Sequence, residues 1–485
     1  MRAADSGASG RPRRTKIVAT LGPASREPDV LRQLFEAGVD VFRLNFAHGT
    51  PEDHSENVNR IREMSRELGH EVGILGDLPG PKLRLGDLED GVAVLHSGSD
   101  VVLEGIADGP PGDAERLPVQ WPAFAKAVED GDPIFLADGR VRLKVTDVSG
   151  DRVTAEVEAG GAVSSHQGVN LPGADAALPD TGTTDEAWIH FACELGIDLL
   201  AVSFVRRPDD LEGIHSVIRE QGADIPLIAK IEKPQAAERA AEIVEAAESG
   251  IMIARGDLGV ELPIEEVPGV QKRLIAMAGR ASKPAITATQ MLATMVRASR
   301  PTRAEVTDVA NAIYDGTDAV MLSEETAVGE YPVEAVACMD RIARETEPDL
   351  RYGDWLFNRV ASDGTDVASS VARAAVGSTY TLGLAAIVVP TRSGRTARLV
   401  SAHRPRVPVL AVSPRIETVR RLRPVFGVSC VLAEDRSGLT ALLDDCARLA
   451  LECGVAHPGD LIGITAGLPE QELGTNLFEI HRVPK

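Results

Sequence analysis

Short runs of apolar, often β-branched residues recur along the chain, and a turn and an amphipathic helical stretch follow each run. Because these runs do not alternate with polar residues, they are typical of strands that are buried on both faces. About eight such strands separated by helices predict a parallel (β/α)8 barrel, the TIM barrel fold. The runs begin at residues 15, 39, 72, 199, 226, 251, 284 and 319.

A long interruption separates the third run from the fourth. Between residues 79 and 177 Gly, Asp and Val dominate, helical periodicity is weak, and residues 138–158 alternate apolar and polar positions between Gly-Asp turns. This pattern is typical of β-hairpins. We therefore expect residues 79–177 to form an inserted β-barrel domain that acts as a lid over the strand ends.

The two ends of the chain differ from the barrel pattern. Residues 347–485 contain new strand–helix units, starting near residues 386, 407 and 460, and predict a C-terminal open α/β domain. Residues 1–12 are small, polar and basic, and we expect a flexible tail there. The catalytic barrel is then expected to consist of residues 13–78 and 178–346.

Composition excludes several classes of function. The chain of 485 residues carries 51 Lys and Arg against 73 Asp and Glu, a net charge of −22, and only 4% aromatic residues, which disfavours binding of nucleic acid. No apolar run is long enough to span a membrane and no secretory signal is present, so we expect a cytoplasmic protein. The five cysteines form no CxxC pair, which implies neither a disulfide framework nor a zinc site.

Polar residues follow nearly every predicted strand. Lys230 and Glu232 are two residues apart, so they point to the same face of their strand. Buried charges of this kind need a partner, a ligand or a metal ion, and an internal salt bridge is the alternative to a site. Among the other strand ends, Asp77 and Ser203 are the residues that we interpret as helix caps. The full set is Arg43, Asn45, Asp77, Ser203, Lys230, Glu232, Arg255, Asp257, Thr289, Ser323 and Glu325.

The residue types in this set indicate a specific chemistry. Two carboxylates without a histidine cluster suit Mg2+, with Mn2+ as the alternative ion, because such a site keeps positions open for substrate oxygens. Arginines beside the ion suit a phosphate or carboxylate substrate, and Lys230 adds a compact positive charge. Positioning, a metal and cations are what phosphoryl transfer requires.

Several long motifs in order resemble those of the pyruvate kinases, over about residues 13–485. The resemblance implies phosphoryl transfer from phosphoenolpyruvate to ADP, giving pyruvate and ATP, the last step of glycolysis, by an enzyme that is typically a homotetramer. The motifs are VDVFRLNFAHG (39–49), GVNLPG (168–173), IAKIEKP (228–234), MIARGDLGVELP (252–263), TATQML (287–292) and residues 300–332.

The resemblance also implies roles for individual residues. Glu232 and Asp257 would hold Mg2+, and Lys230 would stabilise the transferring phosphoryl group and the enolate. The backbone at Gly256 and Asp257 would bind the substrate carboxylate. Further implied roles are phosphoryl binding for Arg43, enolate protonation for Thr289, a proton relay for Ser323 and Glu325, nucleotide binding for Asn45, His48 and Arg84, and lid closure for Asp138.

Four positions depart from the family pattern. Potassium-requiring members have a serine where this chain has Ala47 and a glutamate where it has Lys82, so we expect no potassium requirement, with the Lys82 ammonium replacing the ion. The alternative is that Lys82 lies on the surface of a loop. Thr184 replaces a lysine near the nucleotide and leaves one ADP contact in doubt. Nothing in the sequence explains Glu324 beside Ser323.

The C-terminal domain contains a concentrated basic segment. Between residues 392 and 423 there are nine arginines and a single acid, Glu417. The stretch 391–400 opens a helix after a strand and resembles the family's sugar-phosphate effector loop, so a phosphorylated allosteric effector is expected there. The alternatives are a solvated basic helix and a salt-bridge face between subunits. The predicted effector residues are Thr391, Arg392, Ser393, Gly394, Arg395 and Thr396.

Two other functions compete with this interpretation. A metal-dependent enolate lyase or aldolase on a similar barrel would use the same Mg2+, arginine and carboxylate set, but it would not need Lys230 beside Glu232, Arg84 or a lid. A non-catalytic sugar-phosphate sensor predicts damage at the metal or lysine positions, and none is damaged.

Overall fold

The computed structural model describes residues 13–81, 83–107, 109–137, 139–172, 181–358, 366–435, 438–467 and 474–485, without the side chains of 181–184 and 357–358. The expected tail at 1–12, Lys82 and Asp138 therefore lie outside the described residues, as does the side chain of Thr184.

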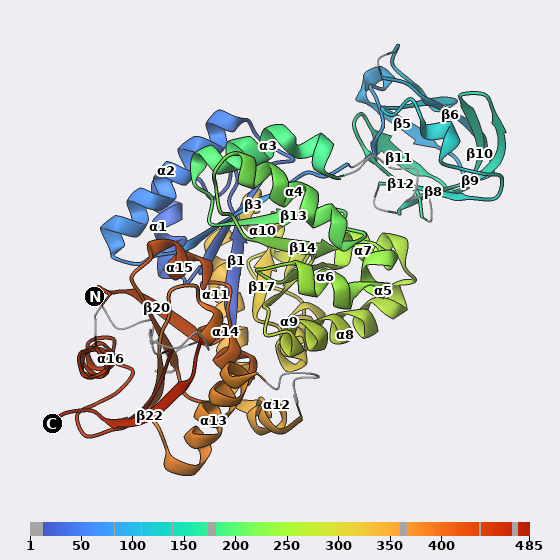
Figure 1. Ribbon diagram of the computed structural model, residues 1–485. Helices are drawn as coiled ribbons and strands as arrows, with labels where there is room; N and C mark the ends of the chain where they lie inside the picture. The colour runs from blue at the N-terminus through green and yellow to red at the C-terminus, as the bar shows by residue number, and fades with distance from the viewer. Residues whose placement is uncertain are drawn as a thin grey trace.

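The predicted (β/α)8 barrel is confirmed. Its parallel strands close in the order β1-β17-β16-β15-β14-β13-β3-β2 and lie at the centre of the molecule (Figure 1). The strands are β1 (Lys16–Thr20), β2 (Val41–Asn45), β3 (Gly73–Asp77), β13 (Leu199–Val202), β14 (Leu227–Ile231), β15 (Ile251–Ala254), β16 (Ala285–Ala288) and β17 (Ala319–Leu322).

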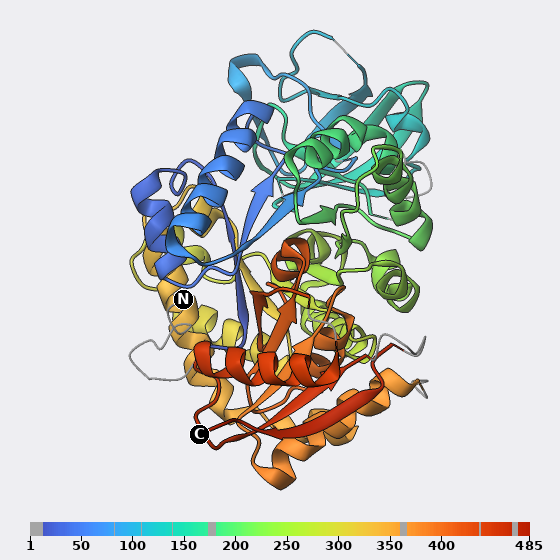
Figure 2. The same ribbon diagram turned by 60° about the vertical axis from the view of Figure 1, so that its left-hand side comes forward.

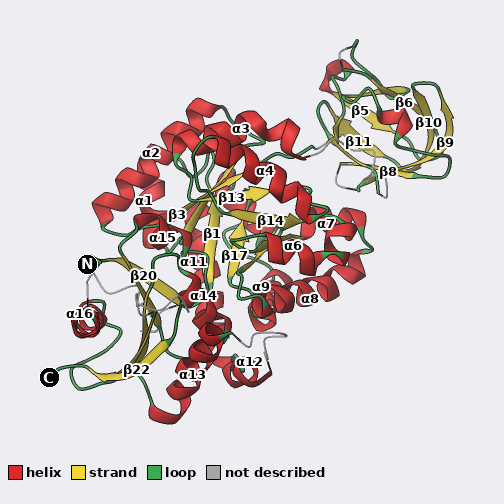
Figure 3. Ribbon diagram, in the orientation of Figure 1, coloured by secondary structure: helices red, strands yellow, loops and turns green. Residues whose placement is uncertain are grey.

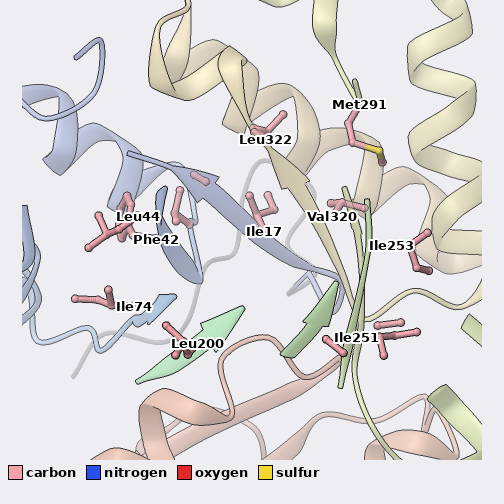
Figure 4. Close-up of a cluster of buried hydrophobic side chains, with 14 of the residues drawn as sticks. Ile17, Phe42, Leu44, Ile74, Leu200, Ile251, Ile253, Met291, Val320 and Leu322 are labelled. Carbon is pink, nitrogen blue, oxygen red and sulfur yellow. The ribbon is translucent and has the colours of Figure 1, made fainter. Parts of the chain in front are cut away.

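Successive residues of these strands bury their side chains in two separate layers. Val18, Val41 and Met252 belong to one buried cluster, whereas their neighbours Ile17, Phe42 and Ile253 belong to a larger one that also includes helix residues. Figure 4 shows side chains of this larger cluster on several strands. Burial on both faces explains why the strands appear in the sequence as continuous apolar runs.

Helices surround the barrel strands (Figure 3). Their ends follow local capping chemistry: Thr50 and Asp53 form a capping box at the start of α2, Thr302 and Glu305 form another at α9, and Gly69 and Gly316 end these helices in the left-handed conformation. The helices are α1 (Pro28–Glu36), α2 (Pro51–Leu68), α3 (Thr181–Leu195), α4 (Pro208–Glu220), α5 (Pro234–Glu238), α6 (Ala240–Ala246), α7 (Arg255–Glu261), α8 (Val267–Arg280), α9 (Arg303–Asp315), α10 (Glu324–Ala327) and α11 (Pro332–Thr346).

An all-β unit, the β domain, is inserted between β3 and α3 and projects to one side of the barrel (Figure 1). Its main sheet has the order β4-β12-β8-β9-β10-β6-β7, and β5 pairs with β11. The Gly86 N–H to Pro118 carbonyl and Gln120 N–H to Arg84 carbonyl hydrogen bonds join the two edges of the main sheet, so it closes on itself. Its strands are β4 (Leu83–Arg84), β5 (Val92–Leu95), β6 (Asp100–Gly105), β7 (Arg116–Val119), β8 (Pro133–Leu136), β9 (Val141–Ser149), β10 (Arg152–Ala159), β11 (Gly161–Ser164) and β12 (Gly168–Asn170).

The C-terminal domain is a layered α/β unit. Its sheet has the order β20-β19-β18-β21-β22, in which only β22 is antiparallel to its neighbour, and α16 lies on the opposite side of the sheet from α13 and α14 (Figures 1 and 2). The elements are α12 (Tyr352–Asn358), α13 (Val367–Leu382), β18 (Ala386–Pro390), α14 (Arg395–Ala402), β19 (Val409–Ser413), α15 (Ile416–Arg421), β20 (Val428–Leu432), α16 (Leu439–Glu452), β21 (Leu461–Ala466) and β22 (Leu477–Arg482).

A buried ion pair joins the C-terminal domain to the base of the barrel. Both terminal nitrogens of Arg404 donate to the Asp318 carboxylate, at 2.9 and 3.1 Å, and the guanidinium lies 4.2 Å from the centre of the Phe426 ring. Arg420 and Arg421 pair with Glu71 and Asp224 of the barrel, each at 2.8 Å. Three of the nine clustered arginines thus bind the barrel of their own chain, a use that the sequence analysis did not consider.

In the part of the chain that the structure describes, none of the helices combines the length and the apolar character needed to cross a lipid bilayer. All five cysteines have free thiols, and Cys338, Cys430 and Cys446 are buried as expected of small apolar side chains.

Replacing Arg404 tests the interdomain ion pair. Arg404→Leu leaves the Asp318 carboxylate buried without its cation, so we expect the free energy of unfolding in urea to fall by about 3 to 5 kcal/mol. The matched control is Arg406→Leu: Arg406 is exposed and lies 5.8 Å from the Tyr352 ring, a contact worth less than about 1 kcal/mol. Equal small losses in both variants would contradict the assignment.

Candidate active site

The carboxyl ends of the barrel strands bring together residues that are far apart in the sequence. Arg43 and Asp77 come from β2 and β3, Ser203 follows β13, and Lys230 and Glu232 end β14. Because the strands are parallel and the barrel is closed, all these ends lie on one rim.

Lys230 is at the centre of the charged network on this rim. Its Nζ lies 2.8 Å from Glu232 Oε1 and 3.2 Å from Asp77 Oδ1, and it donates to Ser203 Oγ at 2.7 Å. Burial lowers the pKa of Lys230, but the Asp77 and Glu232 carboxylates outweigh it and the net pKa is raised. The ammonium therefore stays protonated at physiological pH. The internal salt bridge considered from the sequence does exist, as part of this network.

Asp77 is the shared counter-charge of two cations. It is 1% exposed, and its other oxygen accepts a 2.6 Å hydrogen bond from Arg43 Nε. Burial would raise the Asp77 pKa, but Arg43 and Lys230 hold it below the ordinary value. Arg43 also donates to Thr20 Oγ1 at 3.1 Å, so its guanidinium is fixed from two sides.

The interpretation of Asp77 and Ser203 as helix caps was wrong. Asp77 binds Arg43 and Lys230, while the Ser203 hydroxyl accepts from Lys230 and donates to the Leu78 carbonyl at 2.7 Å. A short polar residue after a strand can be a helix cap or a partner of a buried charge. Only the position of the Lys230 side chain distinguishes these two roles. Both are site residues that sequence reasoning missed.

Glu232 and Asp257 place two carboxylates near each other. Glu232 is 1% exposed, and its Oε2 accepts the Phe204 N–H at 2.7 Å. Burial raises the Glu232 pKa, Lys230 lowers it, and the negative charge of Asp257 in the first turn of α7 raises it again. A divalent cation would relieve this repulsion, so the donor set fits Mg2+. Among the described residues no group of three or more metal-binding side chains surrounds a common point.

Thr289 holds the backbone that is expected to bind the substrate carboxylate. The Gly256 N–H donates to Thr289 Oγ1 at 2.7 Å, so a carboxylate at this position must displace that hydroxyl. Thr289 has a positive φ of 69°, which is strained for a β-branched residue. Arg255 supports it by donating to the Thr289 carbonyl at 2.8 Å and pairing with Asp308 at 2.7 Å.

Glu325 binds backbone groups in the structure. It is 2% exposed and accepts N–H groups from Leu292 at 3.0 Å and from Ser323 at 2.7 Å. This orients the turn that carries Ser323. Glu324 is exposed, and nothing in the structure explains it.

The predicted nucleotide residues lie in two domains, Asn45 and His48 in the barrel and Arg84 in the β domain. Asn45 Oδ1 accepts the Ala47 N–H at 3.3 Å, and the exposed His48 offers its carbonyl to the His54 ring at 2.9 Å. Arg84 lies on β4 in the β domain, where it donates to the His166 carbonyl at 3.1 Å. The structure therefore does not bring Arg84 to the Lys230 network.

The predicted effector residues lie at the N-terminus of α14, away from the barrel rim. Gly394, with φ of 80°, precedes the helix, and its N–H donates to Thr391 Oγ1 at 2.9 Å. Ser393 is exposed, whereas Thr396 is buried beside Thr475. Arg392 pairs with Asp435, and Arg395 pairs with Asp366 at 3.0 Å; both arginine side chains are exposed.

Comparison with known proteins gives a consistent result. The family model described as pyruvate kinase, barrel domain, matches residues 12–336, and the one described as pyruvate kinase, alpha/beta domain, matches residues 369–481. The chain is 42% identical to a pyruvate kinase of Bacillus licheniformis and 44% identical to one of Geobacillus stearothermophilus, each over 97% of this chain and 80% of the relative. It is 43% identical to a pyruvate kinase of Methylorubrum extorquens over 95% of both chains.

Proposed function

The chain belongs to the pyruvate kinase family, and on this premise we propose how its own residues divide the transfer of a phosphoryl group from phosphoenolpyruvate to ADP. The family generally uses Mg2+ and binds phosphoenolpyruvate and ADP. The observation that supports the proposal most directly is the Lys230 ammonium, which Asp77, Glu232 and Ser203 hold on the catalytic rim.

Lys230 and Arg43 stabilise the negative charge that moves during the reaction. A protonated lysine fixed by three partners needs little reorganisation when charge develops on the phosphoryl oxygens and on the enolate. The Arg43 guanidinium, fixed by Asp77 and Thr20, binds the phosphoryl group. Because Asp77 is buried and binds both cations, it sets the distance between them.

Glu232 and Asp257 hold the divalent cation, Mg2+ with Mn2+ as a substitute. The ion supplies a positive charge for the oxygens of the substrate. The Gly256 and Asp257 N–H groups at the start of α7 bind the substrate carboxylate. The Thr289 hydroxyl accepts from Gly256 and donates its own proton to the Ala288 carbonyl at 2.7 Å. When the substrate carboxylate takes over the Gly256 N–H, the hydroxyl turns from the Ala288 carbonyl to the enolate and delivers the proton there. Glu325 fixes the Ser323 turn as the far end of the proton relay.

The β domain acts as the lid. Its insertion after β3 places it at the catalytic rim, where closure excludes water from phosphoryl transfer. Arg84 then reaches the nucleotide phosphates by moving with the domain, beside Asn45 and His48. The resemblance gives Asp138 a role at closure.

This member of the family works without potassium. The Ala47 methyl group has no oxygen to offer a monovalent cation, and the neighbouring Asn45 amide oxygen accepts the Ala47 N–H. In the sequence Lys82 replaces the glutamate of potassium-requiring relatives, and its ammonium group supplies a positive charge without a separate ion.

A phosphorylated effector binds at the N-terminus of α14 in a homotetramer. Thr391, Ser393, Gly394 and Thr396 supply hydroxyl and N–H groups, and Arg392 and Arg395 exchange their exposed acidic partners for the phosphate. Fructose 1,6-bisphosphate, glucose 6-phosphate, ribose 5-phosphate and AMP share the required phosphate group.

Lys230→Met tests the catalytic assignment. Removing the ammonium should lower kcat for pyruvate formation from phosphoenolpyruvate and ADP at least about a hundredfold, because the transition-state charge loses its fixed cation. Mg2+ and substrate binding, measured by calorimetry, should persist. Lys272→Met is the matched control, since Lys272 is exposed on α8 and pairs with Asp315 at the barrel exterior, outside the Lys230 network. Full turnover in Lys230→Met would refute the role.

Potassium independence is tested in buffer free of potassium and ammonium. We expect full activity with Mg2+ alone, and less than a roughly twofold change on adding KCl. Lys82→Glu restores the acid of potassium-requiring relatives, so its activity should become dependent on KCl. A rise of about tenfold or more in the unmodified enzyme on adding KCl would overturn the proposal.

The effector site is tested with the four phosphates named above. At least one should change the apparent affinity for phosphoenolpyruvate about fivefold or more, within the usual range of allosteric coupling. The double variant Arg392→Gln with Arg395→Gln should abolish that response. Arg448→Gln, an exposed paired arginine on α16, should retain it. A response that survives in the double variant places the effector elsewhere.

A further inference from the structure

One buried carboxylate ties together the two chain segments that connect the β domain to the barrel. The chain leaves the barrel after β3 through Gly80 and returns through α3. Asp185 of α3 is 1% exposed, and its two oxygens accept the Gly80 N–H at 3.2 and 3.1 Å across 105 residues of sequence. This contact, the Asp185–Gly80 clamp, lies where the β domain must pivot.

The outgoing connection packs directly on residues that hold the catalytic network. A Cβ at Gly80 would come within 2.7 Å of the Phe204 ring and 2.9 Å of Ser203 Cβ, and Gly80 has φ of 68°. The adjacent Leu78 carbonyl accepts from Ser203 Oγ, which accepts from Lys230 Nζ. Phe204 donates its N–H to Glu232. The position of Gly80 is thus linked to Lys230 through Ser203 and to Glu232 through Phe204.

A small cavity adjoins the outgoing connection at Pro81. This cavity of about 20 Å3 lies between the β domain and the barrel beside Phe204, lined by Pro81, Leu83 and Val169 on one side and by Arg206 and Lys233 on the other. The connection is therefore packed closely at Gly80 and less closely at Pro81, and the directed bond from Asp185 adds a second restraint at this point.

Asp185 changes between its carboxylate and carboxylic acid forms close to neutral pH. The pKa of the Asp185 carboxyl is raised to about 7: burial raises it most, the Gly80 N–H lowers it, Asp77 on β3 raises it, and Lys230 on β14 lowers it. Arg43 on β2 faces the site through its bond to Asp77. Since a carboxylate accepts more strongly than a carboxylic acid, the clamp tightens as pH rises through about 7 and loosens below it.

We propose that Asp185 is a positioning residue for phosphoryl transfer, whose carboxylate holds the outgoing connection at Gly80 and thereby sets Ser203, Phe204 and the groups that they bind. This rests on the proposed roles of Lys230 and Glu232. Asp185 touches no reacting atom. Through Gly80 it couples the orientation of the β domain to the positions of the side chains on the catalytic rim.

Asp185→Asn is the deciding variant, because asparagine keeps the size and one acceptor but does not titrate. The unmodified enzyme should show kcat rising with pH through about 7, and Asp185→Asn should lose that rise. At pH 8 its kcat should fall about tenfold with KM for phosphoenolpyruvate changed less, because displaced catalytic groups lose transition-state stabilisation more than substrate binding. Asp185→Ala should lose more, and Asp185→Glu should recover part of the pH response.

Hydrogen exchange provides a second readout. The peptide that contains Gly80 should exchange faster in Asp185→Asn than in the unmodified protein at pH 8. The matched control is Asp198→Asn: Asp198 is also buried and lies before β13, where it accepts from Arg62 and the Ile74 N–H at the opposite end of the strand from the rim. That variant should keep the pH response whatever its melting temperature.

The outcomes separate this inference from the function on which it rests. If Asp185→Asn keeps the pH response, kcat and Gly80 protection, the clamp has no positioning role even though the enzyme works. If the unmodified enzyme forms no pyruvate, or Lys230→Met keeps full turnover, the proposed function fails first. Should Asp185→Ala not fold, the asparagine variant still decides.

Discussion

The catalytic rim depends on the compensation of buried charge around Asp77. This carboxylate, almost without solvent exposure, is bound by Arg43 on one oxygen and by Lys230 on the other. Removing Asp77 would take the shared counter-charge from two buried cations, and removing either cation would leave the buried charges unbalanced, at a cost of several kcal/mol. Because these residues belong to three different strands, β2, β3 and β14, the requirement also fixes how the strands meet. The electrostatics that stabilises the barrel rim is therefore the same that prepares the site for a phosphorylated substrate.

The inserted β domain is linked to this network through its outgoing connection. Leu78 and Gly80 follow Asp77 within three residues and pack on Ser203 and Phe204, which in turn bind Lys230 and Glu232. Because the domain is inserted at this point, a movement of the domain would displace Leu78 and Gly80 and, through Ser203 and Phe204, the side chains of Lys230 and Glu232. The Asp185–Gly80 clamp also ties α3, which follows the β domain, to these residues. The β domain and the charged groups of the rim are thus joined by one network of hydrogen bonds.

Arginine has two different uses in the C-terminal domain. Arg404 is buried against Asp318 and Phe426, and together with Arg420 and Arg421 it fastens the domain to the barrel base. Arg392 and Arg395 are exposed at the start of α14, with acidic partners that solvent screens. Burial decides between these uses: a desolvated pair resists exchange, whereas an exposed pair can be replaced by a phosphate. The Arg404 pair connects the segment that follows α14 to the base of the barrel.

The sequence by itself determined the barrel, the inserted β unit, the α/β domain and most residues of the rim, because burial on both faces makes each strand a continuous apolar run and exposes polar residues only at its end. It did not determine the roles of Asp77, Ser203 and Asp185, nor the partners of Arg404, Arg420 and Arg421. These depend on contacts between residues that are tens to hundreds of positions apart, and a short polar side chain after a strand has the same local pattern as a cap, a counter-charge or a clamp. Only the closed barrel, which brings these ends within hydrogen-bonding distance, decided among them.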